Sequence, residues 1–371
     1  MKVAIIHEML VKLWGAENVV KDIMELFPDS DLYTLIYDES KVGRYFPASR
    51  IKDVPTITQR IYNLTKRQRL CLPFMSKAIE SIDLSSYDLV ISSSSWFAHW
   101  AITKPETLFV VYYHSPARYL WDYTNEYKKD IWFSTWIKNF LLTKFMLKAR
   151  QWDYLAWQRH DIAIAASKQV SSRITKYYRR DSKLIYPSVY TDEFEIWETD
   201  IKEREYYIIT SALTEFKKVE IAVEAFKLID KDLYIIWEGA YKKYLEKIAP
   251  DNVKFLWYKN RKEINEYYKK AKWFIMCWRD DFGIAPIEAM AAWIPVFALK
   301  EWWLTETNIE WLTWDFFENP KWADFHERFE KFDKDITYWR YDSQKIRHHA
   351  QSFSKERFME EFMAMINSCM V

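Results

Sequence analysis

Short apolar runs alternate with stretches of helical periodicity along most of the chain, and this alternation constrains the fold more than any other feature. In the first half, apolar runs of strand length lie at 2–7, 31–37, 87–95, 107–115 and 161–167, and helical patterns lie at 16–27 and 168–178. Continuous apolar runs are typical of parallel strands that are buried on both faces. The alternation therefore predicts an α/β fold with a doubly wound parallel sheet.

A second series of the same kind follows a break at 183–196, which contains Pro187 and a polar stretch. It has expected strands at 206–213, 232–237, 253–258, 273–278 and 294–299, and expected helices at 218–229, 240–249, 261–271, 285–292 and 354–369. Two Rossmann-like domains in tandem predict a ligand site in a cleft at the carboxyl ends of both sheets. We expect the first domain at 1–190 and the second at 191–350, with a C-terminal helix in 351–371 that packs back toward the first domain.

Composition excludes several classes of protein. A length of 371 residues suits two domains, and a formal net charge of +1 argues against a protein that binds nucleic acid. The three cysteines have no CxxC spacing, which excludes a cysteine-based zinc module and suits a reducing compartment. No apolar run reaches the ~18 residues that a membrane span needs. These features together favour a cytoplasmic protein.

The segment "DDFGIAPIEAMAAWIPV" at 280–296 carries the strongest chemical signal. Asp280 lies in a loop after an expected strand, and Glu288 lies within the next expected helix. The first turn of that helix presents backbone N–H groups and the positive end of the helix dipole. Carboxylates at this place can accept hydrogen bonds from sugar hydroxyls. The alternative is a solvated pair of acidic residues at a helix start.

This segment resembles the E-x7-E motif of retaining, family-4-type glycosyltransferases, which have the GT-B fold. The resemblance extends over nearly the whole chain, through similar segments at 14–20, 112–122, 164–189 and 211–226. It implies two Rossmann-like domains that face a cleft and transfer a hexose from a nucleotide-diphosphate sugar with retention of configuration. The segment 112–122 is similar to the mannosyltransferase-like branch, which implies mannose as the sugar and GDP-mannose as the donor.

The resemblance implies a role for each matching residue of the donor side. Glu288 matches the carboxylate that holds the nucleotide ribose, and Asp280 matches the acidic residue that faces the donor sugar. Lys217 matches the lysine that pairs with the donor diphosphate, and Glu306 matches a residue beside that diphosphate. The donor site is also expected to include Phe282, Gly283 and Ile284.

On the acceptor side, Gly15 and Glu17 match a loop near the phosphates. His114 matches the histidine near the transferred sugar, although without the resemblance it reads equally well as a hydrogen-bonded residue at a strand end. One member of the family pattern is missing, because the arginine that accompanies the lysine falls at Ala212. Arg118 and Lys218 are the candidates to supply that charge.

The mechanism implied by the resemblance is a same-face displacement in which an oxygen of the donor phosphate takes the acceptor proton. It uses no metal or other cofactor, and we interpret the "DSD" at 29–31 as a turn. The acceptor is expected to be a saccharide or a lipid-linked saccharide. Basic amphipathic stretches at 65–77 and 138–150 predict either peripheral contact with the inner face of the membrane or core-facing helices with cationic edges.

Two other functions remain open. A catalytically inactive GT-B protein that binds or scaffolds would explain Ala212. A sugar-nucleotide epimerase would need a hydrolytic set of bases, which is not visible in the sequence.

Tryptophan is abundant where glycine is scarce. The chain has 4 glycines and 20 tryptophans, whereas ~7% glycine would give about 26. Tryptophan stands at positions where the family pattern has glycine, namely Trp14, Trp237, Trp257, Trp293, Trp302, Trp303 and Trp314, with Trp96, Trp100, Trp273, Trp278 and Trp311 as further cases. Sugar-stacking rings and ordinary core packing are alternatives. We favour systematic replacement of glycine, by engineering or by another alteration of the sequence, which predicts weak binding of nucleotide sugars.

Overall fold

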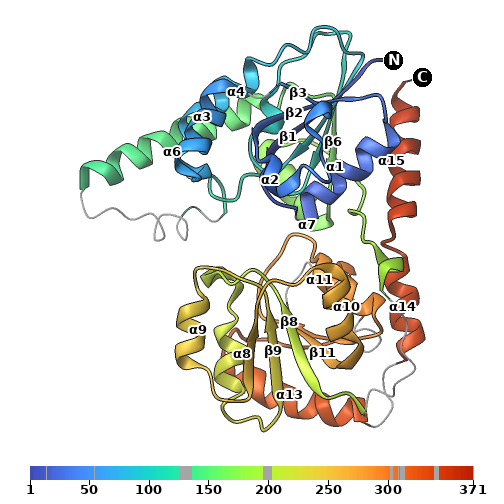
Figure 1. Cartoon of the computed structure of the whole chain (residues 1–371). Coiled ribbons are helices and arrows are strands. Elements are labelled where there is room, and N and C mark those ends of the chain that lie inside the picture. Colours follow the sequence, from blue (N-terminus) through green and yellow to red (C-terminus); the bar gives the residue numbers. More distant parts are fainter. Residues whose placement is uncertain are drawn as a thin grey trace. The chain divides into compact units, whose positions relative to one another are not determined.

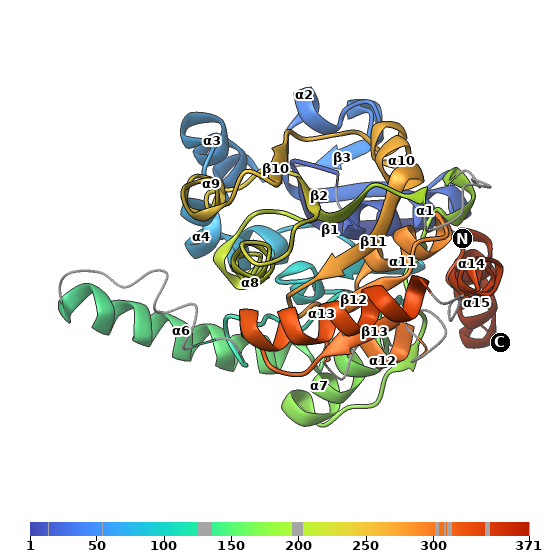
Figure 2. The same cartoon turned by 90° about the horizontal axis from the view of Figure 1, so that it is seen from below.

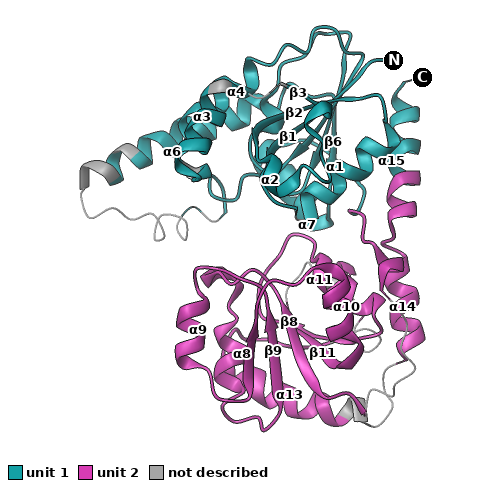
Figure 3. Ribbon diagram, in the orientation of Figure 1, with its two compact units in different colours: residues 1–186, 361–371 teal, residues 187–360 magenta. Residues whose placement is uncertain are grey.

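The computed structural model describes residues 1–13, 15–53, 55–122, 124, 136–194, 203–300, 304–307, 309, 314–337 and 342–370. The chain forms two compact units (Figure 3). Unit 1 comprises Met1–Tyr186 and Glu361–Val371, and unit 2 comprises Pro187–Glu360. Each unit is built around one parallel sheet, so both are α/β domains as the alternation predicts.

The elements of unit 1 follow the order of a doubly wound fold (Figure 1). They are β1 (Val3–Leu10), α1 (Gly15–Leu26), β2 (Asp31–Tyr37), α2 (Glu39–Val42), η1 (Ala48–Arg50), β3 (Ile51–Asp53), α3 (Thr56–Thr65), η2 (Gln68–Cys71), α4 (Leu72–Glu80), β4 (Leu89–Ser94), η3 (Ala98–Trp100), β5 (Leu108–Tyr113), α6 (Trp136–Ala156), β6 (Ile162–Ala165), α7 (Lys168–Tyr178) and β7 (Lys183–Leu184).

The seven strands of unit 1 lie in the order β3-β2-β1-β4-β5-β6-β7, and all neighbouring pairs are parallel. The chain therefore builds outward from β1 in one direction and from β4 in the other. The strand order reverses between β1 and β4, and such a reversal opens a crevice at the carboxyl ends of the strands. The residues at the ends of β1, β4 and β5 are thus placed where a ligand site is expected.

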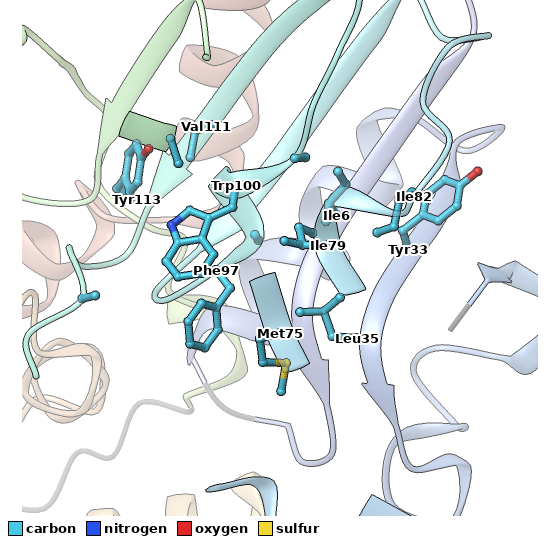
Figure 4. Close-up of a cluster of buried hydrophobic side chains, with 14 of the residues drawn as sticks. Ile6, Tyr33, Leu35, Met75, Ile79, Ile82, Phe97, Trp100, Val111 and Tyr113 are labelled. Carbon is cyan, nitrogen blue, oxygen red and sulfur yellow. The ribbon is translucent and has the colours of Figure 1, made fainter. Parts of the chain in front are cut away.

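Buried apolar side chains join this sheet to the helices on one face. Ile6 of β1 and Leu35 of β2 belong to one cluster with Met75 and Ile79 of α4 (Figure 4). All four are fully or almost fully buried. Burial of aliphatic side chains of this size contributes roughly 1.5–3 kcal/mol each, so this cluster fixes the position of the strands beneath the site.

Unit 2 repeats the design with a different set of elements. They are η4 (Thr191–Glu193), β8 (Tyr206–Thr210), η6 (Glu215–Lys217), α8 (Glu220–Ala225), β9 (Asp232–Ile236), α9 (Lys242–Ile248), β10 (Val253–Leu256), α10 (Arg261–Lys270), β11 (Ala271–Met276), α11 (Ile284–Ala291), β12 (Val296–Leu299), α12 (Leu304–Thr307), β13 (Trp314–Phe317), α13 (Trp322–Thr337) and α14 (Ser343–Gln351). The six strands lie in the parallel order β10-β9-β8-β11-β12-β13, so the order reverses between β8 and β11.

The core of unit 2 is aromatic. Trp273 of β11 is fully buried, and its ring centroid lies 4.1 Å from that of Phe332 and 4.7 Å from that of Phe329, both on α13. Tyr207 of β8 packs edge-on against Trp273 at 4.9 Å. Because aromatic side chains bury large areas, these contacts hold α13 firmly against the sheet.

Several helices, and strands at the edges of the two sheets, were not predicted from the sequence. Beyond the expected elements, the structure contains α3, α4, α13 and α14, together with β3 and β13. The basic stretch at 138–150 lies within a longer helix, α6, which projects away from the sheet of unit 1 (Figures 1 and 2). In the described part of the chain, no helix is both long and apolar enough to cross a membrane.

The last helix, α15 (Lys355–Cys369), begins in unit 2 and ends in unit 1. Phe362 is completely buried, and its ring centroid lies 6.5 Å from that of Tyr112 on β5. This contact ties the end of the chain to the sheet of unit 1.

Two tryptophans at family glycine positions have a backbone that glycine would adopt readily. Trp237 has φ 133° and Trp293 has φ 64°. Both values lie in the region that side chains with a Cβ rarely occupy. The indole N–H of Trp293 is also buried without a hydrogen-bond partner among the described residues. These positions agree with the hypothesis that tryptophan stands in place of glycine.

Other tryptophans occupy positions whose backbone does not require glycine. Trp100, Trp273 and Trp278 are at most 3% exposed, and none has a positive φ. Trp257 is exposed, and Lys242 Nζ lies 3.8 Å from its ring centroid. Trp14, Trp302, Trp303 and Trp311 lie outside the described residues.

Candidate functional site

The point of strand-order reversal in unit 2 carries a lysine–aspartate pair. Lys217 ends η6, in the connection that follows β8, and Asp280 lies in the loop that follows the neighbouring strand β11. Lys217 Nζ donates to Asp280 Oδ2 at 3.1 Å. Trp278 Nε1 lies 3.4 Å from the same oxygen, and Lys217 Nζ lies 4.9 Å from the Trp278 ring centroid. Two residues that lie 63 positions apart in sequence are thus brought together at the carboxyl ends of two neighbouring strands.

The helix that follows this loop begins with one of the four glycines. Gly283 has φ 80° and is the N-cap of α11. Glycine adopts this conformation without strain, so the chain turns sharply from the strand end into the helix. The first backbone N–H groups of any α-helix lack partners within the helix, and they favour anions through the helix dipole.

Glu288, on α11, pairs with an arginine that sequence reasoning did not identify. Arg261 Nη2 donates to Glu288 Oε1 at 3.1 Å, and Arg261 Nη1 donates to Glu193 Oε2 at 3.0 Å. Burial raises the pKa of Glu288, while the charge of Arg261 opposes that rise. Glu288 Oε2 has no hydrogen-bond partner among the described residues, so this oxygen remains available to a ligand hydroxyl.

The loop after β9 packs closely against the loop after β8. A Cβ atom at Gly239 would lie 2.0 Å from the carbonyl oxygen of Leu213, so only glycine fits there. Leu213 N donates to Glu238 O at 3.0 Å, and Tyr241 N donates to Leu213 O at 3.1 Å. These backbone contacts hold the connection that leads to Lys217.

The remaining donor-side residues have different environments. Phe282 is buried, and its ring centroid lies 5.7 Å from that of Phe353, so it supports the loop from within. Ile284 is the first residue of α11 and is partly buried. Glu306 lies in the short helix α12 and is also partly buried.

Of the two candidate replacements for the missing arginine, Lys218 lies in the same unit as Lys217. Lys218 has φ 51°, and its Nζ lies 3.9 Å from Glu220 Oε1. Arg118 belongs to unit 1, whereas Lys217 belongs to unit 2. Lys217 Nζ thus pairs with Asp280, whereas Lys218 Nζ lies beside Glu220, and compensation by Arg118 stays a prediction.

The point of strand-order reversal in unit 1 carries a chain of polar side chains. His114, directly after β5, has its Nε2 2.7 Å from Ser93 Oγ on β4. Ser93 Oγ lies 3.1 Å from Nδ1 of His7 on β1, and the same Nδ1 lies 3.2 Å from the carbonyl oxygen of Ser93. Three adjacent strands therefore contribute one residue each to a continuous arrangement.

Two carboxylates flank His7. Its Nε2 lies 3.9 Å from Glu17 Oε1, and its Nδ1 lies 3.9 Å from Glu8 Oε2. Burial by itself lowers the pKa of His7, but Glu17 and Glu8 outweigh burial, and the net pKa is raised. In contrast, burial and the nearby His7 lower the pKa of His114 to about 3. His114 is therefore neutral over the physiological range of pH.

Glu8 also fills a group of backbone donors at the end of β4. Its Oε1 accepts from the N–H groups of Ser95 at 2.7 Å, Trp96 at 2.6 Å and Phe97 at 3.2 Å. Glu17 is buried in the first turn of α1, which begins at Gly15. Glu17 thus faces His7. The network could have been found from the sequence, because "IIHEML" and "ISSSS" place polar residues inside apolar strands.

Asp29 of the "DSD" segment lies in a turn that precedes β2, as the sequence suggests. Asp31 begins β2 and accepts a hydrogen bond from Tyr87 Oη at 2.5 Å. Among the residues that the structure describes, no group of three or more His, Cys, Asp or Glu side chains is arranged to hold a metal ion.

Known proteins agree with this architecture. Residues 191–348 match the family model of glycosyl transferases group 1. No curated protein matches the chain in sequence.

Solved structures match over almost the entire length. The Anabaena protein HepE in complex with UDP and glucose has 15% identity and a TM-score of 0.72, with 99% of this chain and 100% of that chain covered. Sucrose-phosphate synthase from Thermosynechococcus elongatus has 14% identity and a TM-score of 0.74, with 100% and 99% covered. WaaG, a glycosyltransferase involved in lipopolysaccharide biosynthesis, has 14% identity and a TM-score of 0.62, with 98% and 99% covered.

At these identities the structures establish the fold alone, and the family model matches a segment that lies within unit 2. The chain therefore has the GT-B fold, and its residues 191–348 match the family of glycosyl transferases group 1.

Proposed function

We propose that the protein transfers a hexose from a nucleotide-diphosphate sugar to a saccharide or lipid-linked saccharide, with retention of anomeric configuration. The observation that carries this proposal is the Lys217–Asp280 pair at the strand-order reversal of unit 2. A cation held at that edge, beside the amino-terminal end of a helix, suits a diphosphate. The solved complexes of HepE contain UDP and UDP-glucose, which supports a donor of this class.

The donor nucleotide is assigned to Glu288 and its surroundings. Glu288 Oε1 is occupied by Arg261 at 3.1 Å, and Oε2 accepts from a ribose hydroxyl in the proposal. The Arg261 guanidinium lies 4.9 Å from the ring centroid of Tyr190, which restrains the arginine from the other side. Arg261 therefore orients Glu288 and opposes the rise in its pKa that burial causes.

The reaction is a displacement on one face of the sugar. The bond between the anomeric carbon and the diphosphate oxygen breaks, and its electron pair stays on the diphosphate. The acceptor hydroxyl oxygen bonds to the anomeric carbon on the same face, and its proton passes to an oxygen of the leaving phosphate. Lys217 stabilises the charge that develops on the diphosphate, and Asp280 holds the lysine and faces the donor sugar.

Two donors are the first to test. The resemblance of segment 112–122 to the mannosyltransferase-like branch favours GDP-mannose. The HepE complex with UDP-glucose favours UDP-glucose as the second candidate. Turnover of each donor by the chain, and by Lys217→Ala and Glu288→Ala variants, tests the proposal. Turnover that is lost in both variants supports it.

A lipid-linked acceptor implies that the protein also contacts the surface of an anionic membrane. On α6, Phe140, Leu147 and Leu155 are each at least half exposed. Lys144 and Lys148 are exposed on the same helix between these apolar side chains. Apolar side chains that insert below lipid head groups, with lysines at head-group level, are typical of helices that lie on an anionic surface.

A binding protein without activity is the second candidate function. Ala212 stands where the family has arginine, and Trp237 and Trp293 occupy strained positions in unit 2. Absence of turnover with every donor tested, together with retained nucleotide binding, would favour this candidate.

A further inference from the structure

The hydrogen-bond chain of unit 1 determines which nitrogen of His114 carries the proton. The carbonyl oxygen of Ser93 lies 3.2 Å from His7 Nδ1. A carbonyl oxygen only accepts hydrogen bonds, so His7 Nδ1 must carry a hydrogen. His7 Nδ1 is then a donor toward Ser93 Oγ, which lies 3.1 Å away, in the charged form of His7 that Glu8 and Glu17 favour.

The Ser93 hydroxyl hydrogen must then point away from His7. Its nearest other acceptor is His114 Nε2, at 2.7 Å. An Nε2 atom that accepts a hydrogen bond carries no hydrogen, so a neutral His114 holds its proton on Nδ1. The reverse arrangement, with Nε2–H donating to Ser93, would leave the buried Ser93 hydroxyl without an acceptor among the described residues.

The ring of His114 is also held in place. Its backbone N–H donates to Ser94 O at 2.9 Å, and its ring centroid lies 5.1 Å from that of Tyr112. The side chain is partly exposed, and its Nδ1 has no hydrogen-bond partner within the described part of the chain. Nδ1–H is thus a fixed donor that is left for a ligand.

We propose that His7 and Ser93 are positioning residues that fix His114 as a neutral Nδ1–H donor toward a ligand oxygen at the carboxyl end of the unit 1 sheet. This inference rests on the proposed function for its ligand, whereas the tautomer depends only on unit 1. The groups that face His7 are Glu8 on its own strand and Glu17 on α1. Their negative charges favour the charged form of His7, in which Nδ1 carries a hydrogen.

The ¹⁵N NMR spectrum of the 371-residue chain labelled with ¹⁵N-histidine reports directly which ring nitrogen of His114 carries the proton. The His114 signals are assigned with a His114→Gln variant. The chain as it stands should show His114 as neutral Nδ1–H between pH 5 and pH 8. An Nε2–H tautomer, or a histidinium signal near pH 6, would overturn the proposal without any variant.

Substitution of Ser93 provides a second test of the His114 tautomer. Ser93→Ala should abolish the preference for Nδ1–H. Ser92→Ala is the matched control, because Ser92 is buried on the same strand and its Oγ has no hydrogen-bond partner among the described residues. An equal effect of both variants on the tautomer contradicts the proposal.

Kinetics then separate positioning from a purely structural effect. Ser93→Ala should lower kcat by roughly ten- to a hundredfold, the range for partners that orient a functional histidine, with little change in KM for the donor. His7→Asn keeps an N–H donor near Ser93 and should restore most of the rate relative to His7→Phe. Unchanged kcat in Ser93→Ala contradicts the proposal. The expected tautomer without turnover of any donor would instead refute the proposed function.

Discussion

Lys217 Nζ and Asp280 Oδ2 lie 3.1 Å apart across the point where the strand order of the unit 2 sheet reverses. Neither residue lies within a strand. Each lies in a connection that begins at a strand's carboxyl end, and the two strands, β8 and β11, are neighbours. The sheet topology therefore produces the pair, and the local sequence supplies its chemistry.

Loss of this pair should reduce activity sharply. Lys217→Ala removes the cation that we propose binds the diphosphate, and we expect kcat to fall by roughly 10²–10³-fold, as when one donor to a developing anion is removed. Lys218→Gln is the matched control, since Lys218 Nζ lies 3.9 Å from Glu220 Oε1. Steady-state kinetics with the accepted donor measure both. A similar loss in the two variants would mean that general positive charge, and not Lys217, is required.

Glycine should be the better residue at two strained positions. Trp237→Gly and Trp293→Gly each relieve a positive φ, which costs of order 1–3 kcal/mol for a residue with a Cβ. We expect each variant to unfold at higher denaturant concentration. Trp273→Gly is the contrast, because Trp273 is fully buried in the aromatic core. It should lose about 3–5 kcal/mol or more, as for other truncations of large core residues. Destabilisation by Trp293→Gly would contradict the glycine hypothesis.

The buried carboxylate of Glu288 should make unit 2 sensitive to pH. Burial raises its pKa above the ordinary value. A raised carboxyl pKa favours the folded state while the group is protonated, and this advantage is lost as the pH rises through the folded pKa. Glu288→Gln should therefore gain stability relative to the parent as the pH increases from 4 to 7. Urea unfolding at several pH values measures this, and a constant difference between the two proteins would exclude the effect.

His114 should have the opposite dependence. Burial and the neighbouring His7 lower its pKa to about 3. The unfolded state takes up a proton below about pH 6.5, the ordinary histidine pKa, while the folded state does not, so the folded state is progressively destabilised by acid. His114→Gln should be less acid-sensitive between pH 6.5 and pH 4. Identical pH profiles of the free energy of unfolding would show that His114 is not held neutral.

Binding to anionic vesicles tests the exposed face of α6. Phe140→Ser combined with Leu147→Ser should weaken co-sedimentation with vesicles that contain phosphatidylglycerol, because both side chains are about half exposed. Trp322→Ser is the control, since Trp322 is a similarly exposed aromatic residue of unit 2. Equal binding to neutral and anionic vesicles would exclude the proposed contact.

Much of the fold could be predicted from the sequence because buried parallel strands appear there as continuous apolar runs. The expected strand at 31–37 and the expected helix at 168–178 have the bounds that the structure gives to β2 and α7. Ser167 accepts from Val170 N at 3.0 Å and marks where α7 begins, so a local signal was sufficient there. The helix α13 was missed because its many charged residues obscure the apolar face that packs on the sheet.

Contacts between residues that lie far apart in sequence were harder to predict, because they depend on which strands become neighbours in the folded sheet. Lys217 and Asp280 were each singled out, but their direct contact follows from the adjacency of β8 and β11. Arg261 was missed because nothing in its local sequence points to Glu288, which lies 27 residues away. His7 was missed because a single histidine in an apolar run looks like a core residue.

Calorimetric titration with nucleotide sugars tests the central claim, a donor site in unit 2 whose glycine positions carry tryptophan. The chain is compared with a variant that combines Trp237→Gly, Trp293→Gly, Trp302→Gly and Trp303→Gly, using GDP-mannose and UDP-glucose. We predict weak binding by the chain, clear binding of one donor by the variant, and loss of that binding when Lys217→Ala is added. Equal affinity of the two proteins for both donors, or binding that survives Lys217→Ala unchanged, would contradict the account.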